Sequence, residues 1–149
     1  MRLEDEIKQS KFKNNRQKAV INLIYSSGYL INYLNDRAKT FDITRQQYNV
    51  LRILKGQLPK SASINLIKER MLDKMSDASR IVERLRVKGL VERATSTSDK
   101  RAVDITITPK GLKLIEDMEP TVATVDELFQ SFSEDELNTF NALLDKMRS

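Results

Sequence analysis

The sequence predicts a mainly helical α+β fold, a winged helix-turn-helix, and three observations support this fold class. Apolar residues recur with the i, i+3, i+4, i+7 spacing of a helix that is buried along one side. They are Ala78, Ile81, Val82 and Leu85. Gly89 follows Lys88, and a glycine just after a cation is typical of a helix end. Two short segments, 91–94 and 103–107, then have the pattern of hairpin strands, which would form the wing.

Two longer helices are expected before this stripe. Apolar residues at helical spacing run from residue 18 to about 38 and predict a long first helix. A second helix follows, with Asp42 or Thr44 as its N-cap, and ends near Gly56. Pro59 then enforces a break.

Small polar residues mark the next two helix starts. Ser63 opens a short third helix, and Asp73 or Ser76 is the expected cap of the fourth helix, which carries the apolar stripe. Within the following hairpin, the strand 103–107 alternates apolar and polar side chains, which predicts one buried face. The tip between the strands is polar and has nothing to bury.

Two helices are expected after the hairpin, which gives about six helices and a wing of two or three strands. Thr108 caps the fifth helix. Pro120 lies inside its apolar pattern, so we expect a kink there and continuation through Phe129. Ser133 and Glu136 have the spacing of a capping box and open the sixth helix.

The chain of 149 residues is expected to form one folded unit, 1–149. The winged-helix lobe needs only residues 41–111. The flanking helices, 18–40 and 112–149, therefore keep an apolar face with little left in the monomer to cover it. The economical cover is a second copy, so we expect a homodimer.

Charge is distributed unevenly along the chain. The formal net charge is +5, but residues 74–101 carry +4 and residues 112–149 carry −6. A cationic helix and wing suit a polyanion such as nucleic acid. The alternative is that these are ordinary solvated charges.

Composition removes much of the usual enzyme chemistry. The chain has no cysteine and no histidine, which excludes disulfides, thiolate switches and most zinc, copper and iron sites. We therefore expect no enzyme, no cofactor and no metal. The N-terminus has no apolar signal region and no run is long enough to cross a bilayer, so we expect a cytoplasmic protein without a membrane partner.

Several motifs, taken in order, resemble the MarR family of winged-helix transcriptional regulators. They are the helix SRIVERL at 79–85, KGLVER at 88–93, the wing motif DKR at 99–101, and VDITITPKG at 103–111. The resemblance spans residues 44–147. It implies a dimer whose Ser-Arg helix enters the major groove of DNA and whose wing arginine reaches the neighbouring minor groove.

The expected DNA-binding residues combine this resemblance with the cations of the helix and wing. They are Lys74, Ser76, Asp77, Ser79, Arg80, Arg84, Asp99, Lys100 and Arg101. An arginine donates two parallel hydrogen bonds to guanine in the major groove, and a narrow minor groove attracts its cation. The turn before the helix, 72–75, departs from the Gly-Leu-Ser type common in the family, so no base preference is inferred.

Three of these residues have alternative roles. Asp99 either pairs with the wing arginine or caps its own turn, and the two roles are compatible. Arg84 either contacts a base or pairs with Glu83, another acid or a phosphate. Asp77 either accepts from a cytosine, repels phosphate, or supports the N-terminus of its helix, and we favour the last.

A tyrosine stripe suggests a ligand site. Tyr25, Tyr29 and Tyr33 recur every four residues on the first helix, with Tyr48 expected nearby. Family members often bind small aromatic or anionic ligands between the dimerisation helices and the DNA-binding lobe, and this stripe could line such a cleft. The alternative is core packing or dimer contact, which is the commoner use of such stripes.

The sequence therefore predicts a sequence-specific regulator that binds double-stranded DNA at a pseudo-palindromic operator. We expect a dimeric repressor that a small-molecule effector relieves. The alternative is a winged-helix module that binds another protein, since the fold alone does not fix function. The operator, the effector and the choice between repression and activation stay open.

Overall fold

The computed structural model describes residues 1–149 except 97 and 100, and it confirms the mainly helical winged-helix fold. The six predicted helices correspond to α2–α7, and two short elements, α1 and η1, are additional. The elements in order are α1 (Leu3–Glu6), α2 (Asn15–Lys39), α3 (Arg45–Gln57), α4 (Ile64–Arg70), α5 (Ala78–Val87), β1 (Val91–Thr95), β2 (Val103–Ile107), α6 (Pro109–Ala123), the 3₁₀ helix η1 (Thr124–Phe129) and α7 (Glu134–Arg148).

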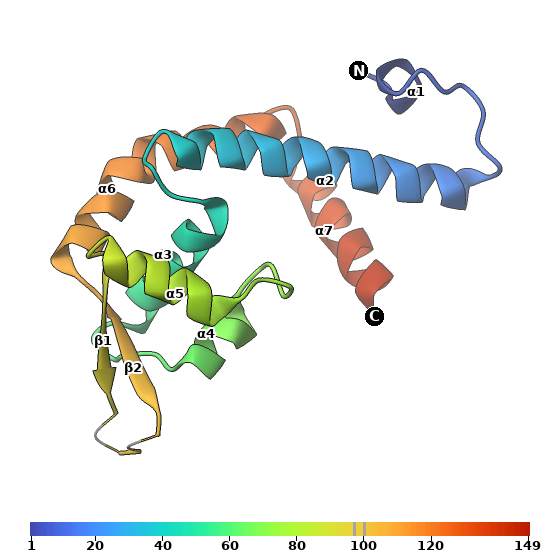
Figure 1. The fold of residues 1–149 in the computed structure, drawn as a ribbon. Coiled ribbons are helices and arrows are strands. Elements are labelled where there is room, and N and C mark those ends of the chain that lie inside the picture. Colours follow the sequence, from blue (N-terminus) through green and yellow to red (C-terminus); the bar gives the residue numbers. More distant parts are fainter. Residues whose placement is uncertain (97, 100) are drawn as a thin grey trace.

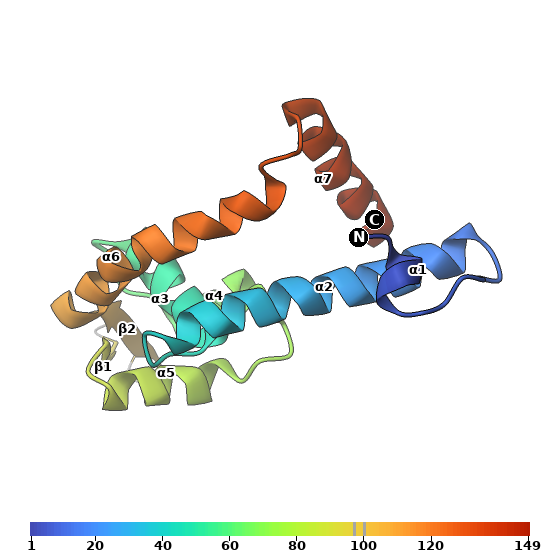
Figure 2. The ribbon, with the colours of Figure 1, turned by 90° about the horizontal axis from the view of Figure 1, so that it is seen from above.

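The molecule has a lobe, formed by α3, α4, α5 and the hairpin, and an arm, formed by α2 with α1 and α7 (Figure 1 and Figure 2). Helices α3, α4 and α5 gather with the hairpin at one end, while α2 extends far past them (Figure 1). Seen from above, α2 and α6 diverge from the lobe, and α1 and α7 lie at the other end of the arm (Figure 2). No helix in the described part of the chain is long and apolar enough to cross a membrane.

Polar caps fix most of the helix starts as predicted. Thr44 accepts from the Gln47 amide at 3.0 Å, and the Gln47 side chain accepts from the Thr44 amide at 3.1 Å, which completes a capping box. Ser63 and Thr108 cap α4 and α6, and Ser133 forms the predicted box with its own partner at the start of α7.

The predicted cap of α5 is wrong. Asp77, rather than Asp73 or Ser76, is the N-cap, and its carboxylate accepts from the Arg80 amide at 3.2 Å. Only Asp77 immediately precedes the first helical residue, where an oxygen reaches the third amide of the helix. The Asp73 carboxylate instead accepts from the Met75 amide within the preceding turn.

The core lies between α3, α5, the hairpin and α6. Its fully buried side chains include Leu51 and Leu54 of α3, Leu85 of α5, Ile105 of β2 and Ile115 of α6. Strands β1 and β2 pair antiparallel, with Val91 opposite Ile107.

A short third contact ties the hairpin to the helices. The backbone of Ile105 exchanges hydrogen bonds of 2.8 and 2.9 Å with that of Ala62, just before α4. This isolated bridge is all that the described residues show of a possible third strand. It fixes β2, and hence the wing, against the segment that leads into α4.

The C-terminal helices follow the prediction with one change of geometry. Pro120 lies within α6, which continues as α-helix to Ala123. The predicted continuation through Phe129 is present, but as the 3₁₀ helix η1.

The arm keeps much apolar surface exposed. The exposed side chains on α2 and α7 are Val20, Leu23, Ile24, Tyr25, Tyr29, Ile31, Phe140, Leu143 and Met147. Near the start of α2, α1 buries Leu3, and the Glu4 carboxylate pairs with Lys18. The hydrogen bond from Lys18 lowers the pKa of Glu4 to about 2. The stabilisation from this ion pair is therefore fully present above the ordinary glutamate pKa and is lost only when strong acid protonates Glu4.

Gly111 sits where α6 approaches the hairpin closely. An added Cβ would lie 2.7 Å from Cγ1 of Ile107 and would collide with the backbone oxygen of Leu90. We expect Gly111→Ala to destabilise the protein by about 1 to 3 kcal/mol, because the core must shift to admit the methyl group. Chemical denaturation measures this change.

Gly56, near the end of α3, is the matched control, since a Cβ added there would have no neighbouring atom within 4 Å. Gly56→Ala should stabilise the protein by about 0.5 to 1 kcal/mol through helix propensity. Equal effects of the two substitutions would contradict the close packing at Gly111.

Candidate nucleic-acid interface

Helix α5 turns one face into the core and presents the other to solvent. Ala78, Val82 and Leu85 are buried. Because these residues occupy one side of the helix, Ser79, Arg80 and Arg84 lie exposed on the other. The predicted division of the helix is therefore present.

Four of the predicted site residues meet at one place. Ser76, Asp77, Arg80 and Arg84 line an open depression of about 450 Å³ between α5 and the first turn of α3. The Asp77 carboxylate is engaged there as the cap of α5, in agreement with the role we favoured for it. Its acceptance of the Arg80 amide fixes the backbone at the start of the helix.

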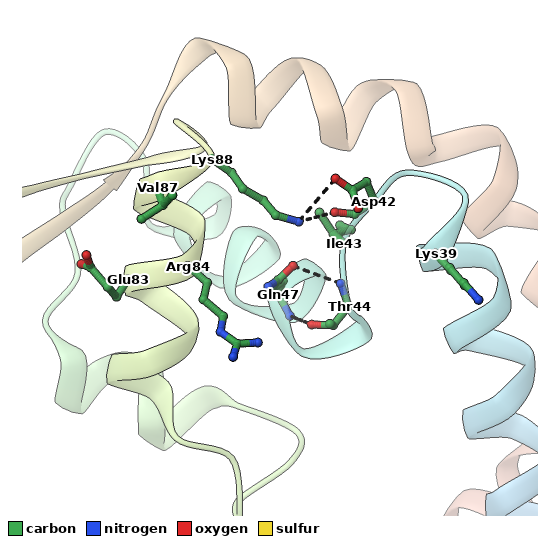
Figure 3. Close-up of a pocket in the computed structure, with 9 residues that line it drawn as sticks. All are labelled: Lys39, Asp42, Ile43, Thr44, Gln47, Glu83, Arg84, Val87 and Lys88. Atoms are coloured by element: carbon green, nitrogen blue, oxygen red, sulfur yellow. Dashed lines mark hydrogen bonds and ion pairs between the residues drawn. The ribbon is translucent and has the colours of Figure 1, made fainter.

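Arg84 reaches into the gap between α5 and α3 (Figure 3). Arg84 also lines a second open cavity of about 500 Å³, together with Lys39, Asp42 and Lys88. The Lys88 ammonium spans the cavity to Asp42, 3.9 Å from its carboxylate, and also donates to the Asp42 carbonyl. This link holds the end of α5 against the turn between α2 and α3.

The suggested pairing of Arg84 with Glu83 is wrong. Glu83 instead accepts two hydrogen bonds from Arg86, at 2.7 and 3.0 Å, and lies 3.5 Å from Arg93 on β1. The Arg84 guanidinium has no hydrogen-bond or ion-pair partner among the described residues. The hydrogen bond from Arg86, with smaller effects of the Arg86 and Arg93 charges, lowers the pKa of Glu83. The same bond and the Glu83 charge raise the pKa of Arg86.

Lys74 points to a different partner from the one predicted. Its ammonium donates to the carbonyls of Lys68, at 3.3 Å, and of Glu69, at the C-terminal end of α4. It thereby satisfies orphan carbonyls of that helix. This places the Lys74 charge on α4.

The wing tip shows which role Asp99 takes. Its carboxylate accepts from the Arg101 amide at 2.9 Å, and its carbonyl accepts from the Ala102 amide at 3.0 Å, so it caps its own turn. Across the described residues there is no ion pair between the Asp99 and Arg101 side chains. Arg101 is exposed, and Lys100 lies outside the described residues.

The tyrosine stripe does not converge on one site. The Tyr25 hydroxyl donates to Glu6 at 2.9 Å, which raises the pKa of Tyr25, and the Tyr33 hydroxyl donates to the Thr124 carbonyl at 3.1 Å. Tyr29 is exposed. Tyr48 lines a cavity whose lining does not include Tyr25, Tyr29 or Tyr33.

That cavity, of about 330 Å³, lies between α2, α3 and the α6–η1 segment. Its polar lining is cationic, with Arg37, Arg45 and Arg52 beside Tyr48 and Asn49. The Arg45 Nε is buried and has no hydrogen-bond partner among the described residues, although the Arg45 Nη2 lies 3.7 Å from Asp73. The arrangement suits an anion that also has apolar surface.

Sequence reasoning missed these arginines. Arg45 and Arg52 are seven residues apart, which places them on one face of α3, and this spacing could have indicated them. Arg37 comes from another helix and had no local signal. Among the described residues, no group of three or more acidic side chains could hold a metal ion.

Comparisons with known proteins support one family. Residues 41–102 match the model of the MarR family. A MarR mutant from E. coli complexed with operator DNA has a similar structure, with a TM-score of 0.79 and 25% identity over 93% of this chain and 99% of that chain. The MepR–DNA complex from S. aureus matches with a TM-score of 0.77 and 24% identity, over 92% and 97% of the two chains.

A third similar structure is of Bordetella bronchiseptica BpsR, whose DNA binding is regulated by 6-hydroxynicotinic acid. It shares 22% identity and a TM-score of 0.73, over 89% of this chain and 99% of that chain. These likenesses agree with the observed fold along most of the chain.

The Glu83 cluster can be tested by titration. We expect Arg86→Ala to return the pKa of Glu83 toward its ordinary value, because the Arg86 hydrogen bond is the largest cause of the lowering. Arg93→Ala should have a smaller effect. The stabilisation from the Glu83–Arg86 pair is fully present above the ordinary glutamate pKa and is lost as the pH falls through the lowered pKa of Glu83.

NMR titration of the Glu83 carboxyl carbon measures these shifts, with Arg84→Ala as the control that leaves the bond from Arg86 in place. An unchanged Glu83 pKa in Arg86→Ala would contradict the cluster as described.

Proposed function

We propose that this chain, whose winged-helix segment is of the MarR family, is a sequence-specific regulator that binds duplex DNA as a dimer and represses by occupying a promoter. One observation carries the proposal. Arg80 and Arg84 on the exposed face of α5, with Ser76 just before the helix, line a single depression, and Arg101 of the wing is exposed to solvent. The DNA complexes of MarR and MepR support it by similarity of fold.

The exposed residues of α5 and of the wing would contact different grooves of the DNA. Arg80 and Ser79 lie in the first turn of α5, the part of a recognition helix that contacts base edges in the major groove. Arg80 would donate two hydrogen bonds to a guanine. Arg101, with Lys100 beside it in the sequence, would enter a minor groove, where phosphates concentrate negative potential.

A second copy of the chain would complete the DNA-binding dimer. The exposed apolar side chains of α2 and α7 form the surface of the arm, and a two-fold axis would bury them against each other. Such a dimer sets two copies of α5 about one helical turn of DNA apart, which matches a pseudo-palindromic operator.

The cavity between α2, α3 and α6 is the proposed effector site. Three arginines favour a small anion, above all Arg45, whose buried Nε has no hydrogen-bond partner in the described part of the chain, and the apolar remainder of the lining favours an aromatic body. The regulation of BpsR by an aromatic acid supports this chemistry for a protein of the same fold. Binding would favour a dimer whose α5 spacing no longer fits the grooves.

DNA binding is tested with an operator selected from a random duplex pool. Arg101→Ala should weaken binding on every sequence and reduce the slope of log K against log salt by about one, because one phosphate-region cation is lost. Arg80→Ala should also change the selected base, at a cost of about 1 to 3 kcal/mol.

Arg16→Ala, which removes an exposed cation on the arm, is the control and should change neither quantity. Absence of duplex binding at low salt, or binding that does not respond to salt, would contradict the proposal and favour the protein-partner alternative.

The dimer is tested by charging its proposed surface. Ile24 is 66% exposed on α2, so Ile24→Glu should leave the monomer fold intact and shift the protein to monomer. Sedimentation measures the mass. Leu72→Glu introduces the same charge at an exposed position on the α4–α5 turn and should stay dimeric. Monomeric wild-type protein at working concentrations would refute the proposed dimer.

A further inference from the structure

Met75 stands out beside the proposed DNA-binding face. Its side chain is 94% exposed, which among the large apolar side chains described is exceeded only by the chain-terminal Met1 at 98%. The neighbouring α5 buries its own apolar residues in the core. Nothing in the described monomer covers Met75, so its apolar surface is free for a partner.

The backbone on which Met75 stands is held in place. The Met75 amide donates to the Asp73 carboxylate at 3.1 Å, and the Ser76 amide donates to the Asp73 carbonyl at 3.3 Å. The second carboxylate oxygen of Asp73 lies 3.7 Å from Arg45 on α3. The turn therefore closes around Asp73, which is itself anchored to another helix.

Two other residues of this turn, Leu72 and Lys74, are tied to the lobe as well. The Leu72 amide donates to the Asn49 side chain on α3 at 3.0 Å, and Lys74 donates to the C-terminal carbonyls of α4. Met75 is thus displayed from a turn that two helices position. A side chain held in this way presents a defined apolar contact.

The place of this contact identifies its partner. Met75 lies two residues before Asp77, the N-cap of α5, and the N-terminal end of a recognition helix faces the base edges. The apolar group on the major-groove edge of the bases is the C5 methyl of thymine. Methionine, with its flexible and polarizable thioether, adapts well to such a contact.

We propose that Met75 is a further specificity-determining residue, which contacts the C5 methyl of one thymine in each half-site. This inference rests on the proposed function. The neighbouring Ser76, Ser79 and Arg80 carry only polar groups for base recognition, which serve hydrogen-bond readout. Met75 adds a contact that depends on a methyl group alone.

The test removes that methyl group and nothing else. Each thymine of the selected operator is replaced in turn, in both half-sites, by deoxyuridine, and the Kd of wild-type protein is measured. We expect one position where the loss is about four-fold per half-site, the factor that corresponds to burying one methyl group. At that position Met75→Ala should bind the thymine and uracil duplexes equally, while Met75→Leu should retain the discrimination.

Val87→Ala is the matched control, since Val87 is 73% exposed at the opposite end of α5. It should keep the wild-type response to uracil. Circular dichroism and sedimentation confirm that Met75→Ala is folded with the wild-type mass, as its exposure predicts.

The outcomes separate this inference from the function on which it rests. If the protein binds no duplex, the proposed function fails and the inference falls with it. If it binds the operator but no thymine-to-uracil change depends on Met75, or no thymine lies in the half-site, only the inference fails. Position-specific loss of discrimination in Met75→Ala, restored in Met75→Leu, supports it.

Discussion

Burial of the apolar stripe of α5 is the constraint on which the rest of the structure depends. Ala78, Val82 and Leu85 fill the centre of a core shared with α3 and the hairpin. Because these residues face inward, helical geometry places Ser79, Arg80 and Arg84 on the outward face. The surface that we assign to DNA is thus a by-product of how the lobe packs.

Bonds between elements then fix where α5 begins and ends. At its C-terminal end, Lys88 contacts Asp42, and the Lys110 ammonium donates to the Lys88 carbonyl at 2.8 Å. Along its length, Glu83 joins it to Arg93 on the wing. At its N-terminal end, the turn anchored through Asp73 sets its approach. Individually, such exposed ion pairs contribute little to stability, but together they specify orientation.

The cationic cavity shares residues with these anchors. Arg45 and Asn49 line the cavity, and both bind the turn before α5, through Asp73 and the Leu72 amide respectively. Leu72 itself lines the same cavity. An anion that engaged Arg45 would therefore compete with Asp73 and act on the start of the recognition helix.

Local rules explain what the sequence could predict. Ser63, Thr108 and Ser133 are predictable as caps, and Thr44 as one of two candidates with Asp42, because the cap and its amide partner are three residues apart. The exposed face of α5 followed from the spacing of its apolar residues. Local spacing does not choose the cap of α5, because Asp73, Ser76 and Asp77 all satisfy the same rule, and only the three-dimensional turn assigns Asp73 to Met75.

Local rules could not predict side-chain contacts between residues that are far apart in the sequence. The partners of Glu83 and Lys74, and the meeting of Arg37 with Arg45 and Arg52, depend on how helices pack, which no local spacing encodes. The tyrosine stripe shows the converse. Its spacing is regular, yet Tyr25 and Tyr33 bind different partners. Tyr25 contacts Glu6 of α1 and Tyr33 contacts Thr124 of η1, because these two elements lie against different parts of α2.

The most direct test of a paired, DNA-reading α5 is a hydroxyl-radical footprint of the protein on its selected operator. Our account predicts two protected stretches, related by a dyad and about one helical turn apart. A single unpaired stretch, or no protection at saturating protein, would contradict it.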